Sequence, residues 1–126
     1  QRDWGYAPEY VEGMWRMMQQ SEPKDYVLAT GITHTVRKFV ELAFSEVKIN
    51  IQWRGSGVDE KGLDSKTGDV LVEINPKYYR PTEVDFLLGD ASKAEAELGW
   101  KATTSLEELV SMMVHEDWEK VKRRGY

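Results

Sequence analysis

The sequence predicts a mixed α/β fold with four helices and about three short strands. Two observations favour this class: apolar residues recur at helical spacing in four segments, and they alternate with polar residues in shorter segments. The chain has 126 residues, of which 40% are hydrophobic and 11% aromatic, enough for one domain with a core. Three strands make a thin sheet for four helices, which suggests that a neighbouring part of the protein is missing.

The first two helices are predicted by their boundaries and their apolar faces. Pro8 suits the first residue of a helix because its missing N–H costs nothing there, and Pro23 follows the end of that helix. Thr33 or Thr35 is expected to cap the second helix. The apolar faces are Val11, Met14, Trp15 and Met18 in the first helix, and Val36, Phe39, Val40, Ala43, Phe44 and Val47 in the second.

The last two helices carry capping signals. Ser92 is expected to begin a short helix that Gly99 closes. Ser105 and Glu108 have the spacing of a capping box, which predicts the start of the closing helix. That helix ends in basic residues, which suit the negative end of the helix dipole: Lys120, Lys122, Arg123 and Arg124.

Three strands and two connecting segments complete the prediction. The short apolar run 26–29 predicts a buried strand, residues 49–54 alternate as a half-buried strand does, and residues 70–74 predict the third. Residues 55–69 hold glycines and many charges, which predicts an exposed loop, and residues 77–90 predict a polar hinge.

Composition excludes several functional classes. The absence of cysteine rules out disulfides, thiolate metal sites and thiol nucleophiles within this sequence. The longest apolar runs are a few residues, so we expect no membrane-spanning segment, and the net charge of −5 argues against nucleic acid as a partner. These features predict a soluble, cytoplasmic protein.

The residues of common catalytic sites are missing from the sequence. His34 and His115 lie far apart without metal-ligand spacing, which predicts that the chain holds no metal ion. Gly55 and Gly57 do not continue into a glycine-rich dinucleotide motif, and no tyrosine is followed four residues later by lysine. We therefore expect no catalytic residue and no cofactor-binding residue in this chain.

Two polar clusters are candidate binding sites. Arg2 lies just before a helix, where its planar guanidinium could bind phosphate oxygens; the alternative is an ion pair with a nearby carboxylate. Arg80 and Glu83 are separated by a rigid Pro81 turn, so the guanidinium could bind phosphate while the carboxylate accepts from ribose hydroxyls. The alternative is a turn stabilised by their own ion pair.

Taken together, these clusters and their surroundings resemble the C-terminal part of the GDP-mannose 4,6-dehydratase family of extended short-chain dehydrogenases/reductases. The resemblance rests on segments that follow one another in the family's order: residues 2–5, 9–15, 25–31, 33–40, 78–85, 89–94, 98–101 and 106–110. It spans nearly the whole chain, and the narrowest motifs are Arg-Asp-Trp-Gly and Tyr-Tyr-Arg-Pro-Thr-Glu-Val-Asp.

The resemblance implies that residues 1–126 form the C-terminal substrate-binding lobe of an enzyme whose N-terminal Rossmann domain, absent from this chain, binds NADP. Such enzymes convert GDP-mannose to GDP-4-keto-6-deoxymannose and are expected to be homo-oligomers, dimers or tetramers. Arg2 and Arg80 would hold the pyrophosphate and Glu83 the ribose, with Arg37 a weaker candidate for substrate binding. The segment 26–30 would complete the sheet of the missing domain. Two alternatives stay open: another GDP-sugar epimerase or reductase, and a non-catalytic binding or interaction module.

Overall fold

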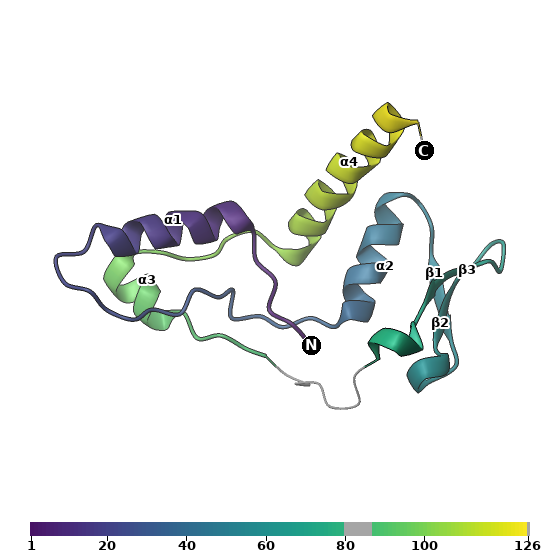
Figure 1. The fold of residues 1–126 in the computed structure, drawn as a ribbon, viewed down its shortest axis with the longest axis horizontal. Coiled ribbons are helices and arrows are strands. Elements are labelled where there is room, and N and C mark those ends of the chain that lie inside the picture. The colour runs from purple at the N-terminus through teal and green to yellow at the C-terminus, as the bar shows by residue number, and fades with distance from the viewer. Residues whose placement is uncertain (80–86, 126) are drawn as a thin grey trace.

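The computed structural model describes residues 1–79 and 87–125. In these residues four α-helices and a three-stranded antiparallel sheet form an elongated arrangement (Figure 1). The helices are α1 (Ala7–Met18), α2 (Val36–Glu46), α3 (Ser92–Leu98) and α4 (Leu106–Arg124). The strands are β1 (Ile51–Arg54), β2 (Lys61–Asp64) and β3 (Val70–Glu73), and two 3₁₀ turns are η1 (Gly57–Asp59) and η2 (Pro76–Tyr78).

All four predicted helices are confirmed, although α1 begins at Ala7, one residue before Pro8. The Thr35 hydroxyl accepts a hydrogen bond from the backbone N–H of Lys38 and begins α2. Ser105 and Glu108 form the predicted capping box of α4. Gly99 closes α3 with a φ of 62°, in the left-handed region that glycine adopts at least cost.

The sheet differs from the prediction at two places. The strand predicted at residues 26–29 is wrong for the described part of the chain, where no backbone–backbone hydrogen bond joins this segment to another. A strand is defined by its partner, and an apolar run alone does not supply one. The loop predicted at residues 55–69 contains β2, which pairs with both β1 and β3.

β2 is hard to recognise in the sequence because its centre is Gly62. A Cβ atom there would lie 3.0 Å from Ile51 Cγ2 and 3.2 Å from Val72 Cβ, so the neighbouring strands close over the glycine. The register pairs Ile51 with Asp64 and Arg54 with Lys61, and it shifts between Gly62 and Leu63 on the β3 side. Side chains of β1 and β3 therefore pack over the backbone of Gly62 in the central strand.

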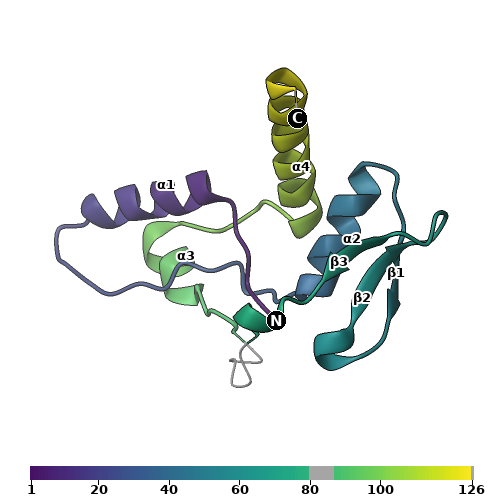
Figure 2. The same ribbon diagram turned by 45° about the vertical axis from the view of Figure 1, so that its right-hand side comes forward.

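Two small apolar clusters hold the helices together. Ala94 and Leu98 of α3 pack with Trp100, and Tyr10 of α1 meets the Trp100 ring edge-on at 5.5 Å between centroids. The second cluster lies at the start of α4, which packs against α2: Leu106, Leu109 and Val110 are buried. Figure 2 shows α3 below α1 on one side and α2 beside the sheet on the other. The helix α4 rises between these two parts.

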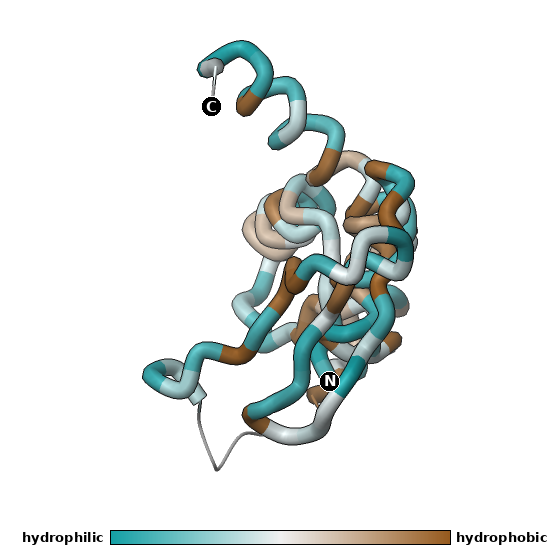
Figure 3. Tube along the Cα trace, turned by 90° about the vertical axis from the view of Figure 1, so that its right-hand side faces the viewer, coloured by the Kyte–Doolittle hydropathy of each residue, from teal (hydrophilic) through white to brown (hydrophobic). Residues whose placement is uncertain are grey.

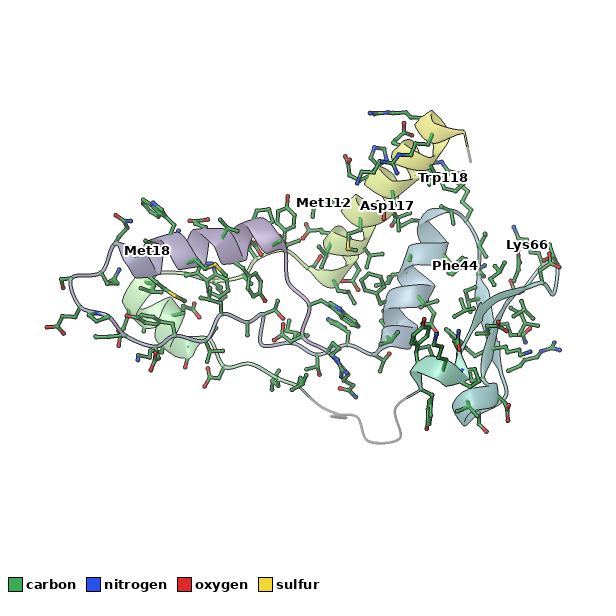
Figure 4. All side chains as sticks on the ribbon, viewed as in Figure 1. Met18, Phe44, Lys66, Met112, Asp117 and Trp118 are labelled. Atoms are coloured by element: carbon green, nitrogen blue, oxygen red, sulfur yellow. The ribbon has the colours of Figure 1, made fainter. Side chains whose placement is uncertain are left out.

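Large apolar side chains also remain on the surface. The whole apolar face predicted for α1 is more than half exposed, at Val11, Met14, Trp15 and Met18. Met18 lies at the far end of α1 and Trp118 on the outer half of α4 (Figure 4). Hydrophobic and hydrophilic stretches follow one another along the Cα trace (Figure 3). No helix in the described part of the chain is long and apolar enough to cross a membrane.

Candidate functional site

The N-terminal segment lies against the turn that leads into α2, and this contact positions Arg2. The backbones of Arg2 and His34 exchange two hydrogen bonds, each 2.9 Å between nitrogen and oxygen. The Thr33 hydroxyl donates to Gln1 Oε1 at 3.0 Å. Both Figure 1 and Figure 2 show the N-terminus beside the segment that enters α2.

Asp3, the residue after Arg2, binds the turn at residues 30–31 through its carboxylate. Its Oδ1 accepts hydrogen bonds from the Thr30 N–H at 3.1 Å and from the Thr30 hydroxyl at 2.6 Å, and its Oδ2 accepts from the Gly31 N–H at 3.0 Å. Gly31 has a φ of 74°, which suits the turn that presents both N–H groups to the carboxylate. Trp4 then packs on Phe39 of α2, with ring centroids 5.2 Å apart.

Arg37 lies in the first turn of α2 and faces the sheet. Its guanidinium forms an ion pair with Glu60 and lies over the Trp53 ring, 5.2 Å from the ring centroid. The Trp53 indole N–H donates to Glu41 Oε1 at 2.9 Å, so the arginine and the tryptophan both tie α2 to the sheet. The role of Arg37 in substrate binding stays a prediction.

Arg80 and Glu83 lie outside the described residues. The described segment that follows them returns to the turn held by Asp3: a Cβ at Gly89 would lie 2.2 Å from Ala29 Cβ, and a Cβ at Gly31 would lie 3.9 Å from the Gly89 carbonyl oxygen. Residues 29–31 and 88–89 line a cleft of about 520 Å³. The turn at 30–31 is therefore the meeting point of the Arg2 segment and the chain after residue 86.

Side-chain caps and an acidic residue mark the helix N-termini in the described part of the chain. In α2 the Thr35 hydroxyl accepts from the N–H of Lys38, and in α4 the Ser105–Glu108 capping box accepts from the N–H groups of Glu108 and Ser105. The first turn of α1 carries the carboxylate of Glu9, and α3 has only 7 residues. Within residues 1–79 and 87–125, no group of three His, Asp or Glu side chains could hold a metal ion.

Two acidic residues, Asp3 and Glu9, make contacts that no sequence motif indicated. Glu9 Oε1 accepts hydrogen bonds from the N–H and hydroxyl of both Thr103 and Thr104, at 2.7 to 3.1 Å. Burial raises the pKa of Glu9, but these hydrogen bonds outweigh it and hold the pKa below its ordinary value of 4.5. The spacing of residues in the sequence could not reveal the contacts of Asp3 or of Glu9, because each contact joins residues far apart in the chain.

Comparison with known proteins identifies the family. A family model described as GDP-mannose 4,6 dehydratase matches residues 1–113. The chain belongs to the GDP-mannose 4,6-dehydratase family. This confirms the resemblance that the sequence motifs suggested.

Relatives from distant organisms match the chain over nearly its full length. The GDP-mannose 4,6-dehydratase of Sinorhizobium fredii is 57% identical over 93% of the chain, which corresponds to 33% of that protein. The GDP-mannose 4,6 dehydratases of Drosophila melanogaster and Homo sapiens are 56% and 50% identical over 97% and 96% of the chain. The chain spans about a third of the length of these relatives and matches their C-terminal part.

Proposed function

We propose that residues 1–126 are the C-terminal substrate-binding portion of a GDP-mannose 4,6-dehydratase. This lyase converts GDP-mannose to GDP-4-keto-6-deoxymannose, a precursor of GDP-fucose. The observation that carries the proposal is the 57% identity to a relative of that name across 93% of the chain. The full enzyme is expected to be a cytoplasmic homo-oligomer, a dimer or a tetramer.

In this proposal the chain binds the GDP half of the substrate. Arg2 and Arg80 contact the pyrophosphate, because a guanidinium offers two parallel N–H donors to phosphate oxygens. Glu83 accepts hydrogen bonds from the ribose hydroxyls. The backbone pairing of Arg2 with His34 supports this role, since it holds the arginine at a defined place beside α2.

The cofactor of the reaction belongs to another part of the enzyme. The N-terminal Rossmann domain is expected to bind NADP, which would supply the hydride acceptor and donor for the hexose. The sequence supports this assignment, because it holds neither a glycine-rich dinucleotide motif nor a tyrosine followed four residues later by lysine. We therefore assign no catalytic residue to this chain and expect that the chain alone forms no product from GDP-mannose.

Substitutions at Arg80 in the full-length enzyme test the nucleotide site. Arg80→Ala is expected to raise the KM for GDP-mannose by about one to two orders of magnitude, because a hydrogen bond to a charged group is typically worth about 1.5–3 kcal/mol. Arg80→Lys should recover part of the loss, since lysine keeps the charge but not the two-pronged geometry. Glu83→Gln should raise KM less. The kcat and the affinity for NADP should change little.

Matched arginine variants distinguish binding from folding. Arg54→Ala removes an exposed arginine on β1 and should leave KM unchanged. Arg37→Ala breaks the contacts with Glu60 and Trp53, so the melting temperature should fall, and any rise in KM measures its part in substrate binding. If Arg80→Ala lowers the melting temperature while KM stays normal, Arg80 only stabilises its turn and the nucleotide-site assignment is wrong.

A further inference from the structure

Asp3 joins the start of the chain to a turn almost thirty residues away. Both of its carboxylate oxygens are used: Oδ1 by the N–H and hydroxyl of Thr30, and Oδ2 by the N–H of Gly31. Charged acceptors form stronger hydrogen bonds than neutral ones, especially where the contact is partly buried. The carboxylate therefore fixes the position of the backbone at residue 3 relative to residues 30–31.

Arg2 is held from the other side of the same turn. The two backbone hydrogen bonds between Arg2 and His34 continue the contact that Asp3 makes with Thr30 and Gly31. In an extended segment, successive side chains leave the backbone in opposite directions. Anchoring the Asp3 side chain to the turn thus sets the direction in which the neighbouring Arg2 side chain leaves the backbone.

We propose that Asp3 is a positioning residue, which orients Arg2 toward the phosphates of the nucleotide sugar. The proposal rests on the proposed function, because it requires that Arg2 binds phosphate. Asp3 acts on the turn rather than on the substrate, because its carboxylate accepts three hydrogen bonds from Thr30 and Gly31. Its effect on binding passes through the backbone that it shares with Arg2.

The test is a double-mutant cycle in the full-length enzyme with Asp3→Asn, Arg2→Ala and the double variant. Asparagine keeps the size of Asp3 but turns an NH₂ group toward an N–H donor of the turn. Asp3→Asn is expected to raise the KM for GDP-mannose by about three- to tenfold, the equivalent of one lost hydrogen bond, with kcat nearly unchanged. Arg2→Ala should raise KM further, and the double variant should not exceed Arg2→Ala alone.

Controls separate positioning from a general loss of stability. Asp64→Asn removes another carboxylate that accepts a turn N–H, from Lys66 at 2.7 Å, and should leave KM unchanged. Thr30→Val removes the hydroxyl that donates to Asp3, together with its contacts with the Ile32 backbone, and keeps both N–H donors. It should give a smaller rise in KM than Asp3→Asn, and it decides the question if Asp3→Asn does not fold.

The KM values and melting temperatures of these variants distinguish a wrong role for Arg2 from a wrong role for Asp3. If Arg2→Ala leaves KM unchanged, the proposed role of Arg2 in substrate binding is wrong. If Arg2→Ala raises KM but Asp3→Asn or Thr30→Val lowers only the melting temperature, then Asp3 is structural and the positioning role alone is wrong. Additive effects of Asp3→Asn and Arg2→Ala would also overturn that role, because Asp3 would then act independently of Arg2.

Discussion

Glu9 gives the sharpest prediction about stability, because one of its oxygens holds the segment between α3 and α4. Oε1 accepts from the N–H and hydroxyl groups of Thr103 and Thr104, while the Glu9 carbonyl accepts from the Trp100 indole N–H at 2.6 Å. Its other oxygen, Oε2, is buried without a hydrogen-bond partner among the described residues. Replacing Glu9 by alanine removes the side-chain contacts and leaves the backbone contact in place.

The expected loss is about 2 kcal/mol of local stability. One hydrogen bond to a charged group is typically worth about 1.5–3 kcal/mol, and four bonds to one oxygen do not add. Thr103 is exposed, so water can replace its lost hydrogen-bond partner. Thr104 is partly buried, so the loss of its partner accounts for more of the destabilisation. A change of about 2 kcal/mol corresponds to a roughly 30-fold change in the equilibrium between closed and open forms.

Hydrogen exchange measures this opening directly. In the full-length enzyme at pH 7, Glu9→Ala should reduce the protection of the Thr103 and Thr104 amides by about 30-fold. The control is Glu12→Ala in the same helix, which removes the contact with Arg16 and should leave those two amides protected. Unchanged protection in Glu9→Ala would show that the four hydrogen bonds contribute nothing to holding the segment.

The pH dependence of the same protection provides a second test. Because the folded-state pKa of Glu9 lies below 4.5, its ionised form stabilises the fold fully above that pH. This contribution is lost as the pH falls through the lower folded-state pKa. After correction for intrinsic exchange, protection of the two amides should therefore fall in acid in the wild type and stay flat in Glu9→Ala. Equal acid profiles would refute the role of the Glu9 charge.

Two further predictions concern backbone strain and association. Lys48 follows the C-terminus of α2 and has a φ of 63°, so Lys48→Gly should raise the free energy of unfolding by up to about 1 kcal/mol. Gly99 has a φ of 62°, so Gly99→Ala should lower the free energy of unfolding by about 1 kcal/mol. Denaturant titration measures both changes, and two changes of the same sign would contradict this explanation. The isolated chain should self-associate through the exposed face of α1 and the unpaired segment 26–30; a sharply melting monomer by ultracentrifugation and calorimetry would contradict this.

The helices could be predicted from the sequence because their hydrogen bonds are local. Thr35, Ser105 and Gly99 act within a few residues of themselves, so the caps of α2 and α4 and the end of α3 are visible in the order of residues. β1 and β3 also show their alternation. β2 could not be found, since Gly62 contributes no side chain and its packing depends on the strands on either side.

The candidate site was predicted only in part, for the same reason. The guanidinium chemistry of Arg2 suggested a phosphate contact, but its pairing with His34 joins residues 32 positions apart. Arg37 was proposed from a motif, and only the structure shows its contacts with Glu60 and Trp53. Arg80 and Glu83 lie outside the described residues, so their assignment still rests on the family resemblance.

Asp3 and Glu9 both use a carboxylate to bind the backbone of an irregular segment. The turn at residues 30–31 and the segment at residues 103–104 are irregular, yet their backbone N–H groups need acceptors where they are partly buried. In each case a carboxylate from the N-terminal part of the chain accepts two backbone N–H groups and at least one threonine hydroxyl. Carboxylates thus hold segments that no strand pairing holds among the described residues. Some acidic residues of this chain therefore have a structural role. Substitution of Asp3 or Glu9 should lower stability more than substitution of an exposed acidic residue such as Glu12.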